Sequence, residues 1–285
     1  MTADSSPTPR ERTLIVSAPR TVAPPPVALT IAGSDSGGGA GLQADLRTFS
    51  VFGVLGACAV TALTAQNTLG VRACEPVGPD FVEQQLDAVL DDLPVRAVKT
   101  GMLATPQIVE LLVERADDLP QLVVDPVLVS TTGHSLGGPG TDSALWALLS
   151  RALVVTPNLA EAATLLGHPV QTLDQAVDAA HELAATGARW VVVTGGHLDG
   201  DAVDVVVHGG RVELLGAPRV RTGNDHGTGC TFAAAVVASL AHGDSVRAAL
   251  LVAKRYVHEN LAAAAGWSLG RGAGPLAWEP LSGQP

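Results

Sequence analysis

A glycine-rich turn followed by a run of small residues has the clearest chemical potential in this sequence. The turn is Gly227-Thr228-Gly229, and Cys230 leads into the small-residue run 231–238. Glycines let successive backbone N–H groups point at one spot, and the N-terminus of a following helix adds the positive end of its dipole. The pattern predicts an anion hole suited to phosphate and to a phosphoryl group in transfer. An ordinary glycine turn leading into a core helix would have the same sequence.

Cys230 is expected to lie in the first turn of that helix. There the helix dipole favours a thiolate, so the sequence predicts a lowered thiol pKa and a candidate general base. The alternative is a small apolar residue that only forms part of a wall.

A second polar pair follows an apolar run that ends at Thr156. Asn158 and Glu161 have the spacing of a helix-capping box, in which each side chain binds the backbone N–H of the other. The same two side chains could instead hold hydrated Mg²⁺ near phosphates, because Mg²⁺ usually takes one or two carboxylates and keeps its waters. Both interpretations remain open from the sequence.

Two further segments could contact a small ligand. Five glycines occur in the nine residues 33–41, which allows close backbone approach, but the Gly-Lys-Ser/Thr ending of a P-loop is missing. An ordinary turn between a strand and a helix explains the glycines equally well. Gln66 offers a donor and an acceptor together, which suits the edge of a heteroaromatic amine, although it could also belong to a simple turn.

Apolar runs alternate with helical stretches from residue 27 onward, which predicts a mostly parallel α/β sheet covered by helices on both faces. Gly209-Gly210 predicts an antiparallel hairpin at one edge. Ligands of such sheets bind beyond the carboxyl ends of the strands, where the polar motifs fall. The Pro-rich residues 1–26 are expected to form a disordered tail, and residues 276–285 a C-terminal tail. We expect strands at 27–33, 57–64, 71–77, 96–100, 121–125, 152–156, 190–194, 203–208 and 212–215, and helices at 39–53, 80–92, 106–116, 159–166, 173–185 and from 230 and 245.

The composition excludes several classes of function. The net charge of −11 argues against nucleic acid or an anionic membrane as the main partner. Three cysteines without paired spacing give no disulfide framework and favour a reducing cytoplasm. No apolar run reaches the length of a membrane span. The histidines do not form a metal cluster, although His197 and His226 are expected to approach the site.

Taken in order, these motifs resemble the ribokinase-like superfamily, and specifically the hydroxymethylpyrimidine/phosphomethylpyrimidine kinases of thiamine biosynthesis. The resemblance runs from about residue 27 to 275. It rests on segments 28–35, 38–45, 61–68, 99–103, 125–127, 156–162, 195–197 and 226–230. It implies an αβα sandwich formed by one kinase domain over 27–275, ATP as phosphoryl donor, Mg²⁺, and a homodimer. The implied reaction phosphorylates 4-amino-5-hydroxymethyl-2-methylpyrimidine to the monophosphate and then to the diphosphate.

The resemblance also implies roles for single residues. Gln66 would bind the pyrimidine edge, and Gly227-Thr228-Gly229 would form the anion hole. Cys230 occupies the position where sugar-kinase relatives carry an aspartate base. The pyrimidine pocket would further include Gly33, Asp45, Met102 and Val127, the nucleotide site Asn158, Thr194 and Gly196, and the metal site Glu161.

The chain departs from the family pattern at three places that bear on nucleotide affinity and the second phosphorylation. Asp225 replaces a usual threonine, residues 130–133 lack a frequent lysine, and Thr194 replaces another lysine. Two other functions fit the same motifs. A pyridoxal kinase would also phosphorylate a hydroxymethyl group on a flat ring, and a non-catalytic sensor would bind the pyrimidine without turnover.

Overall fold

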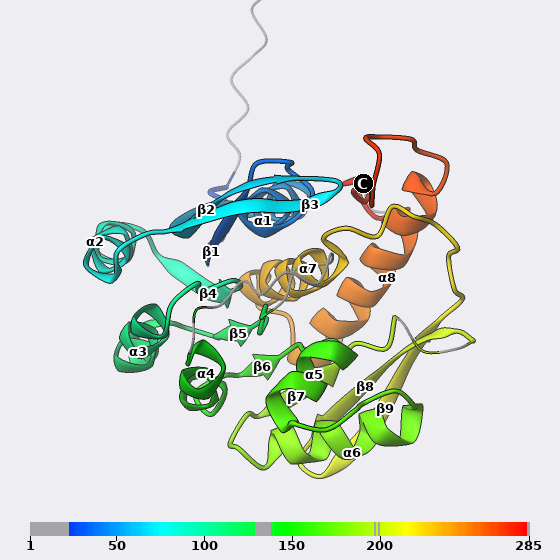
Figure 1. Cartoon of the computed structure of the whole chain (residues 1–285). Coiled ribbons are helices and arrows are strands. Elements are labelled where there is room, and N and C mark those ends of the chain that lie inside the picture. Colours follow the sequence, from blue (N-terminus) through cyan, green and yellow to red (C-terminus); the bar gives the residue numbers. More distant parts are fainter. Residues whose placement is uncertain (1–22, 129–137, 139, 197, 199, 284–285) are drawn as a thin grey trace, which may run out of the picture.

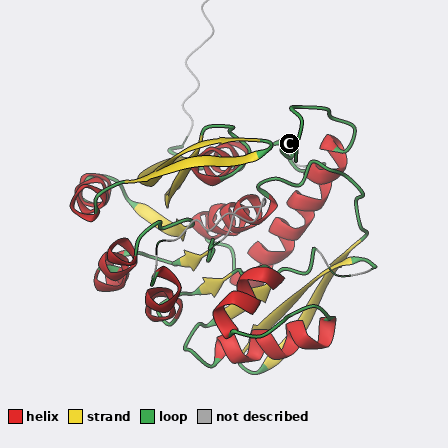
Figure 2. Cartoon of the chain, in the orientation of Figure 1, coloured by secondary structure: helices red, strands yellow, loops and turns green. Residues whose placement is uncertain are grey.

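The computed structural model describes residues 23–128, 138, 140–196, 198 and 200–283. Within them one sheet has nine strands in the order β3-β2-β1-β4-β5-β6-β7-β8-β9 (Figures 1 and 2). Strands β2, β1, β4, β5, β6 and β7 are parallel, whereas β3, β8 and β9 run antiparallel to their neighbours. The expected mostly parallel α/β sheet with an antiparallel hairpin, β8–β9, is therefore confirmed. A further antiparallel strand, β3, forms the opposite edge. The strands are β1 (Val27–Asp35), β2 (Leu55–Asn67), β3 (Gly70–Pro76), β4 (Val95–Thr100), β5 (Val123–Val124), β6 (Val154–Val155), β7 (Trp190–Val193), β8 (Ala202–His208) and β9 (Arg211–Ala217).

Helices cover both faces of the sheet (Figure 1). One apolar cluster lies between the sheet and helices α1, α7 and α8, and a second lies beneath α2 to α6. Helix α7 lies directly against the sheet, and all its residues from 231 to 241 are buried. Its alanine-rich sequence permits this close approach, because small side chains keep the helix axis near the strands. The helices are α1 (Gly41–Val51), α2 (Pro79–Leu90), α3 (Pro106–Glu114), α4 (Thr141–Leu149), α5 (Leu159–Leu166), α6 (Leu173–Ala184), α7 (Thr228–His242) and α8 (Val246–Ala264), with a 3₁₀ turn at Ala116–Asp118.

The chain changes direction across the sheet at β1. From β1 it passes through α1 on one face to β2. It then continues through the edge strand β3 and, on the other face, through helix α2 to β4. Strands β2 and β4 therefore lie on opposite sides of β1. A crevice opens beyond the carboxyl ends of strands at such a point, and ligands bind there in open α/β sheets.

Two features differ from the sequence expectations. Helix α4 is not among the expected helices, because the Gly- and Ser-rich stretch before it reads as a loop. Its apolar spacing, Leu145, Leu148 and Leu149, was the available signal, and all three are buried. The segment expected to be a C-terminal tail packs on the domain, because Leu276 and Leu281 have apolar surface to bury. Of the expected N-terminal tail, residues 1–22 lie outside the described part.

Among the described residues, no helix is both long and apolar enough to cross a membrane.

Candidate active site

A pocket of about 690 Å³ opens at the carboxyl ends of the parallel strands. It brings together most of the residues singled out from the sequence, which come from β1, β2, the loops after β4 to β7, and the start of α7. Those lining it are Gly33, Gln66, Met102, Val127, Asn158, Glu161, Thr194, Gly227, Thr228, Gly229 and Cys230. Asp45 and Gly196 do not line it.

The glycine turn forms the N-terminus of α7 and faces the pocket. Gly227 has a left-handed backbone with φ of +85°, and no side chain among the described residues caps the helix. The first N–H groups of a helix lack partners within it, so this end presents donors and a positive dipole end to the pocket. The turn packs tightly, because a Cβ on Gly227 would lie 2.0 Å from the carbonyl oxygen of Gly39. The arrangement can bind an anion.

Cys230 is half-buried in the pocket wall, but its thiol is not acidic. Burial raises its pKa to about 12, and the carboxylates of Asp125 and Asp45 act in the same direction. The Lys99 ammonium and the backbone N–H of Gly41 oppose this without reversing it. The expectation of a lowered thiol pKa is therefore wrong. The helix dipole favours a thiolate, but removal of water and two nearby carboxylates weigh more.

This raised pKa predicts slow alkylation of Cys230. At pH 8 its thiolate fraction would fall on the order of 1000-fold below that of an ordinary thiol, and the greater nucleophilicity of a basic thiolate recovers about 30-fold. Burial and the charge of Glu75 raise the pKa of Cys74 as well, so we expect iodoacetamide to modify exposed Cys74 about tenfold faster or more, with the Cys230 rate still rising above pH 10. Peptide mass spectrometry resolves the three cysteines. A Cys230 rate that levels off below pH 8.5 would contradict the raised pKa.

A buried ion pair, centred on Lys99, lies at the floor of the pocket. The Lys99 ammonium lies 3.0 Å from Asp45 and 3.5 Å from Asp125, and neither Lys99 nor Asp45 is exposed to solvent. Thr30 also donates to Asp45, at 2.6 Å. The Asp45 carboxylate is paired with Lys99 and does not line the pocket, so a direct contact between Asp45 and a ligand stays a prediction. Among the described residues Lys99 is the one lysine or arginine that lines the pocket, and the carboxylates hold its pKa above the usual range despite burial.

The glycine-rich loop after β1 is organised by Asp35. One carboxylate oxygen accepts from Gly37 N–H at 2.8 Å, and the other accepts from Gly39 and Ala40 N–H at 3.1 and 2.9 Å. Burial alone would raise the pKa of Asp35, but hydrogen bonds from His226, Gly37 and Ala40 outweigh it and lower that pKa. These backbone donors are therefore used within the loop and are not directed at a ligand.

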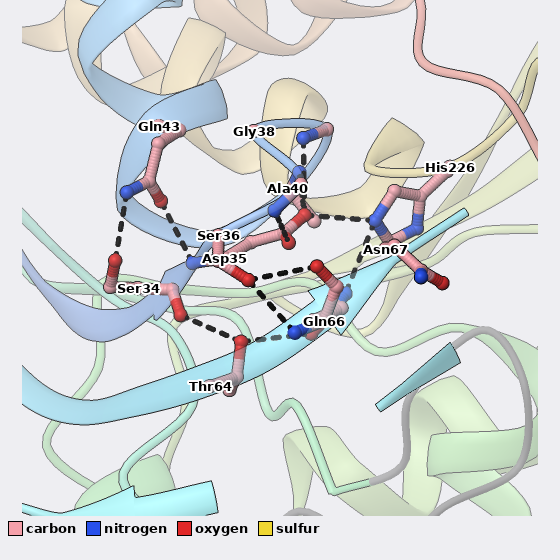
Figure 3. Close-up of polar contacts among 12 residues, drawn as sticks. Ser34, Asp35, Ser36, Gly38, Ala40, Gln43, Thr64, Gln66, Asn67 and His226 are labelled. Atoms are coloured by element: carbon pink, nitrogen blue, oxygen red, sulfur yellow. Dashed lines mark hydrogen bonds and ion pairs between the residues drawn. The ribbon is translucent and has the colours of Figure 1, made fainter. Parts of the chain in front are cut away.

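Gln66 lies beside His226 at the end of β2 (Figure 3). One end of its amide is 3.3 Å from His226 Nε2, which is itself 3.0 Å from Asp35 Oδ2. The other end of the amide lies 3.3 Å from Thr64 Oγ1. A polar network thus joins the end of β1, the end of β2 and the residue before the anion hole.

An apolar wall lines part of the same pocket as Gln66. A Cβ on Gly33 would lie 2.9 Å from the sulfur of Met102, so the glycine leaves room for the Met102 side chain in this wall. Met102 packs with Ala62 and Ala104, and Val127 lies against the same small cluster. The wall and the Gln66 amide together suit a planar ring with a polar edge.

Asn158 and Glu161 form the capping box at the start of α5. Asn158 N–H donates to Glu161 at 2.9 Å, and Glu161 N–H donates to the Asn158 side chain at 2.9 Å. Burial raises the pKa of Glu161 well above its usual range, and the charge of Asp125 adds to this. A cation at the pocket would relieve that repulsion. Among the described residues no cluster of three or more metal-binding side chains exists.

Thr194 and Gly196 follow β7. Thr194 lies beside Asn158, with its N–H donating to Pro157 O at 2.9 Å, and it lines the pocket. Gly196 does not line the pocket, and its carbonyl oxygen accepts from the Arg219 guanidinium at 2.5 Å; its contact with a nucleotide stays a prediction. His197 and the lysine-free residues 130–133 lie outside the described part.

Comparison with known proteins identifies the family. The sequence matches the phosphomethylpyrimidine kinase family over residues 35–277. The chain belongs to the phosphomethylpyrimidine kinase family. A hydroxymethylpyrimidine/phosphomethylpyrimidine kinase of Rhizobium meliloti is 48% identical to this kinase over 258 residues, which cover 88% of the chain and 96% of the relative.

Solved structures of two relatives share the ribokinase-like fold of this kinase. Clostridium difficile phosphomethylpyrimidine kinase is 39% identical with a TM-score of 0.72, covering 82% of this chain and 98% of that one. An ADP complex of Bacillus subtilis pyridoxal kinase is 41% identical with a TM-score of 0.77, covering 82% and 91%. The family membership confirms a phosphotransferase.

Proposed function

We propose that this kinase transfers the γ-phosphoryl group of ATP to the hydroxymethyl group of 4-amino-5-hydroxymethyl-2-methylpyrimidine, and then phosphorylates the monophosphate. The observation that carries the proposal is that one pocket joins the Gln66 amide, the apolar side chains of Met102 and Val127, and the uncapped helix N-terminus at Gly227. The amide and the apolar side chains suit the ring, and the helix end suits the transferring group. The name of the Rhizobium meliloti relative supports both steps.

The chain's own residues then have distinct tasks. Gln66 holds the ring edge while Gly33, Met102 and Val127 fix its plane. The N–H groups of Gly227-Thr228-Gly229 stabilise charge on the transferring phosphoryl group, and alignment of the hydroxyl with the phosphorus supplies much of the remaining rate. Asp45 supports the floor of the pocket indirectly, through its ion pair with Lys99.

Cys230 is proposed to relay the substrate proton. Its thiol hydrogen-bonds Asp125, whose pKa burial raises although Lys99 opposes the shift. As the hydroxyl oxygen bonds to phosphorus and ADP leaves, Sγ takes the hydroxyl proton and passes its own proton to the Asp125 carboxylate. The relay needs no resting thiolate and therefore agrees with the raised thiol pKa.

The nucleotide is proposed to lie over Asn158, Thr194 and the loop at Gly196. Glu161 and Asn158 would hold Mg²⁺ through its water shell, because Glu161 is a pocket carboxylate whose charge is disfavoured by burial and by the neighbouring Asp125. When bound, Mg²⁺ neutralises charge on the β- and γ-phosphates. Asp225, at the pocket edge, adds a negative charge that this cation would offset.

We also propose that the kinase forms a homodimer and works in the cytoplasm. Leu63, which is 56% exposed, lies near Ala65 and its cross-strand partner Ala73 on one face of β2–β3, and we propose that a second copy covers this face.

All three cysteines are free thiols, which supports the proposed location in a reducing compartment.

Pyridoxal is the second candidate substrate, because a pyridoxal kinase is 41% identical to this chain. We expect a higher kcat/KM for the pyrimidine when both compounds compete for the same enzyme with ATP and Mg²⁺. A higher kcat/KM for pyridoxal would reassign the protein to vitamin B6 salvage. Binding of the pyrimidine by calorimetry without any phosphorylated product would indicate a sensor.

A further inference from the structure

The Gln66 amide is held from both flanks by side chains that have no assigned role (Figure 3). His226 lies on one flank, with its Nε2 atom 3.3 Å from the amide group. Thr64 lies on the other flank, with its hydroxyl oxygen also 3.3 Å from the amide group. An amide rotated by 180° has almost the same shape, so the polarity of these neighbours decides which end carries oxygen.

Asp35 fixes the proton of His226. The Asp35 carboxylate accepts hydrogen bonds from Gly37, Gly39 and Ala40 N–H groups, and an ionised carboxylate can only accept. Its Oδ2 atom lies 3.0 Å from His226 Nε2. His226 Nε2 must therefore carry a hydrogen, and it can donate but not accept on this side.

The proton on His226 determines the orientation of Gln66. An amide NH₂ next to His226 Nε2–H would place two donors together, so the amide oxygen must face His226. The amide nitrogen then faces Thr64. That contact is satisfied as well, because the Thr64 hydroxyl donates to Ser34 O at 2.9 Å and its oxygen accepts from Gln66. The single Nε2–H of His226 is then shared between Asp35 Oδ2 and the Gln66 oxygen, and nowhere in the chain from Asp35 to Ser34 does a donor face a donor.

We propose that His226 and Thr64 are specificity-determining positioning residues that lock the Gln66 amide in one orientation. The proposal rests on the proposed function of Gln66 as the reader of the ring edge. One N–H and one lone pair of Gln66 remain for the ligand, and their order is fixed. The locked amide accepts an edge in which a ring-nitrogen acceptor adjoins an amino donor, and it rejects an edge with the reversed order.

The competing ring is the 4-oxo analogue, 5-hydroxymethyl-2-methylpyrimidin-4(3H)-one. It has nearly the same shape, but its N3–H donates and its O4 accepts. An unlocked glutamine would rotate and bind either ring. A locked glutamine would place its N–H against the N3–H of the 4-oxo ring and its oxygen against O4. These buried polar groups would stay unpaired, so the locked site should discriminate strongly against the 4-oxo ring.

Calorimetric Kd values for the 4-amino and 4-oxo compounds test the lock without requiring turnover. We expect the wild type to prefer the 4-amino ring by on the order of 100-fold. His226→Leu and Thr64→Val each remove one contact and should reduce the preference to about tenfold or less. His226→Gln retains an N–H donor and Thr64→Ser retains the hydroxyl, so both matched controls should keep the preference. Melting temperatures confirm that each variant is folded.

The two positions lie on different segments, so agreement between them separates the lock from local damage. An unchanged Kd ratio in folded His226→Leu and Thr64→Val would overturn the proposal. So would a wild type that binds both rings equally. Phosphorylation assays on the same samples report separately on function. A wild type that discriminates in binding but forms no product supports the lock and contradicts the proposed kinase reaction.

Discussion

Replacing Gly227 with alanine is expected to lower kcat by about 100-fold or more, the loss found when oxyanion-type donors are removed or displaced. The new Cβ would lie 2.0 Å from the Gly39 carbonyl oxygen, and the backbone at 227 has φ of +85°. The turn must therefore shift away from the loop that Asp35 holds. The N–H groups at the start of α7 move with it, and the melting temperature should fall as well.

The matched control for Gly227→Ala is Gly243→Ala. Gly243 ends the same helix with φ of +96°, but nothing lies within 4 Å of a Cβ built there. Gly243→Ala carries the same backbone strain far from the pocket, so it should lose stability while keeping kcat. Steady-state kinetics on folded protein compare the two variants. Equal kcat values in both would show that the turn at 227 does not stabilise the reaction.

Replacing Glu161 with glutamine should weaken Mg²⁺-dependent activity by about 10- to 100-fold while leaving the fold intact. Glutamine keeps an oxygen for the Asn158 N–H, and the capping box at the start of α6 already uses glutamine, Gln175, at the corresponding position. The variant also removes the charge that Asp125 disfavours. We therefore expect an unchanged or slightly higher melting temperature and a higher Mg²⁺ concentration for half-maximal rate.

Ser245→Ala provides the control for capping alone. Ser245 caps the start of α8 by accepting from the Ala248 N–H at 3.3 Å, and it does not line the pocket. Its loss should lower the melting temperature by the amount expected for a lost cap and leave the Mg²⁺ titration unchanged. If Glu161→Gln instead lowers stability as Ser245→Ala does, with wild-type activity per folded molecule, Glu161 serves only the helix.

The fold could be predicted because its elements are local patterns. Continuous apolar runs mark the parallel strands, and the Gly-Gly pair marks the β8–β9 hairpin. Helix α4 was missed because its apolar spacing follows a segment with loop composition. Residues 276–285 are expected to form a tail, yet the burial of Leu276 and Leu281 anchors them to the domain.

The site could be predicted only where the motif itself contacts the pocket. Gly227 and Gln66 lie at strand ends or helix starts, which meet at one edge of the sheet. Asp45 could not be placed, because the sequence does not show that its helix turns it toward Lys99. A lysine within an apolar strand does signal a buried partner, and an aspartate ahead of a glycine run signals backbone capping by Asp35.

The chemistry of Cys230 shows a further limit. The helix dipole can be inferred from the chain order, and it favours a thiolate. Burial and the carboxylates of Asp125 and Asp45 come from distant segments and raise the thiol pKa to about 12. Non-local electrostatics therefore reversed a correct local argument. The relation of His226 to Gln66 and Thr64 is likewise a product of tertiary structure.

Phosphorus NMR of the purified enzyme with ATP, Mg²⁺ and 4-amino-5-hydroxymethyl-2-methylpyrimidine tests the central claim most directly. We expect a phosphomonoester signal to appear first and a diphosphate of the pyrimidine to follow, with ADP formed in step with each transfer. Both signals should be absent when the pyrimidine is omitted. ADP formation without a phosphorylated pyrimidine, or no reaction over many hours with folded enzyme, would contradict the assignment of this chain as a pyrimidine kinase.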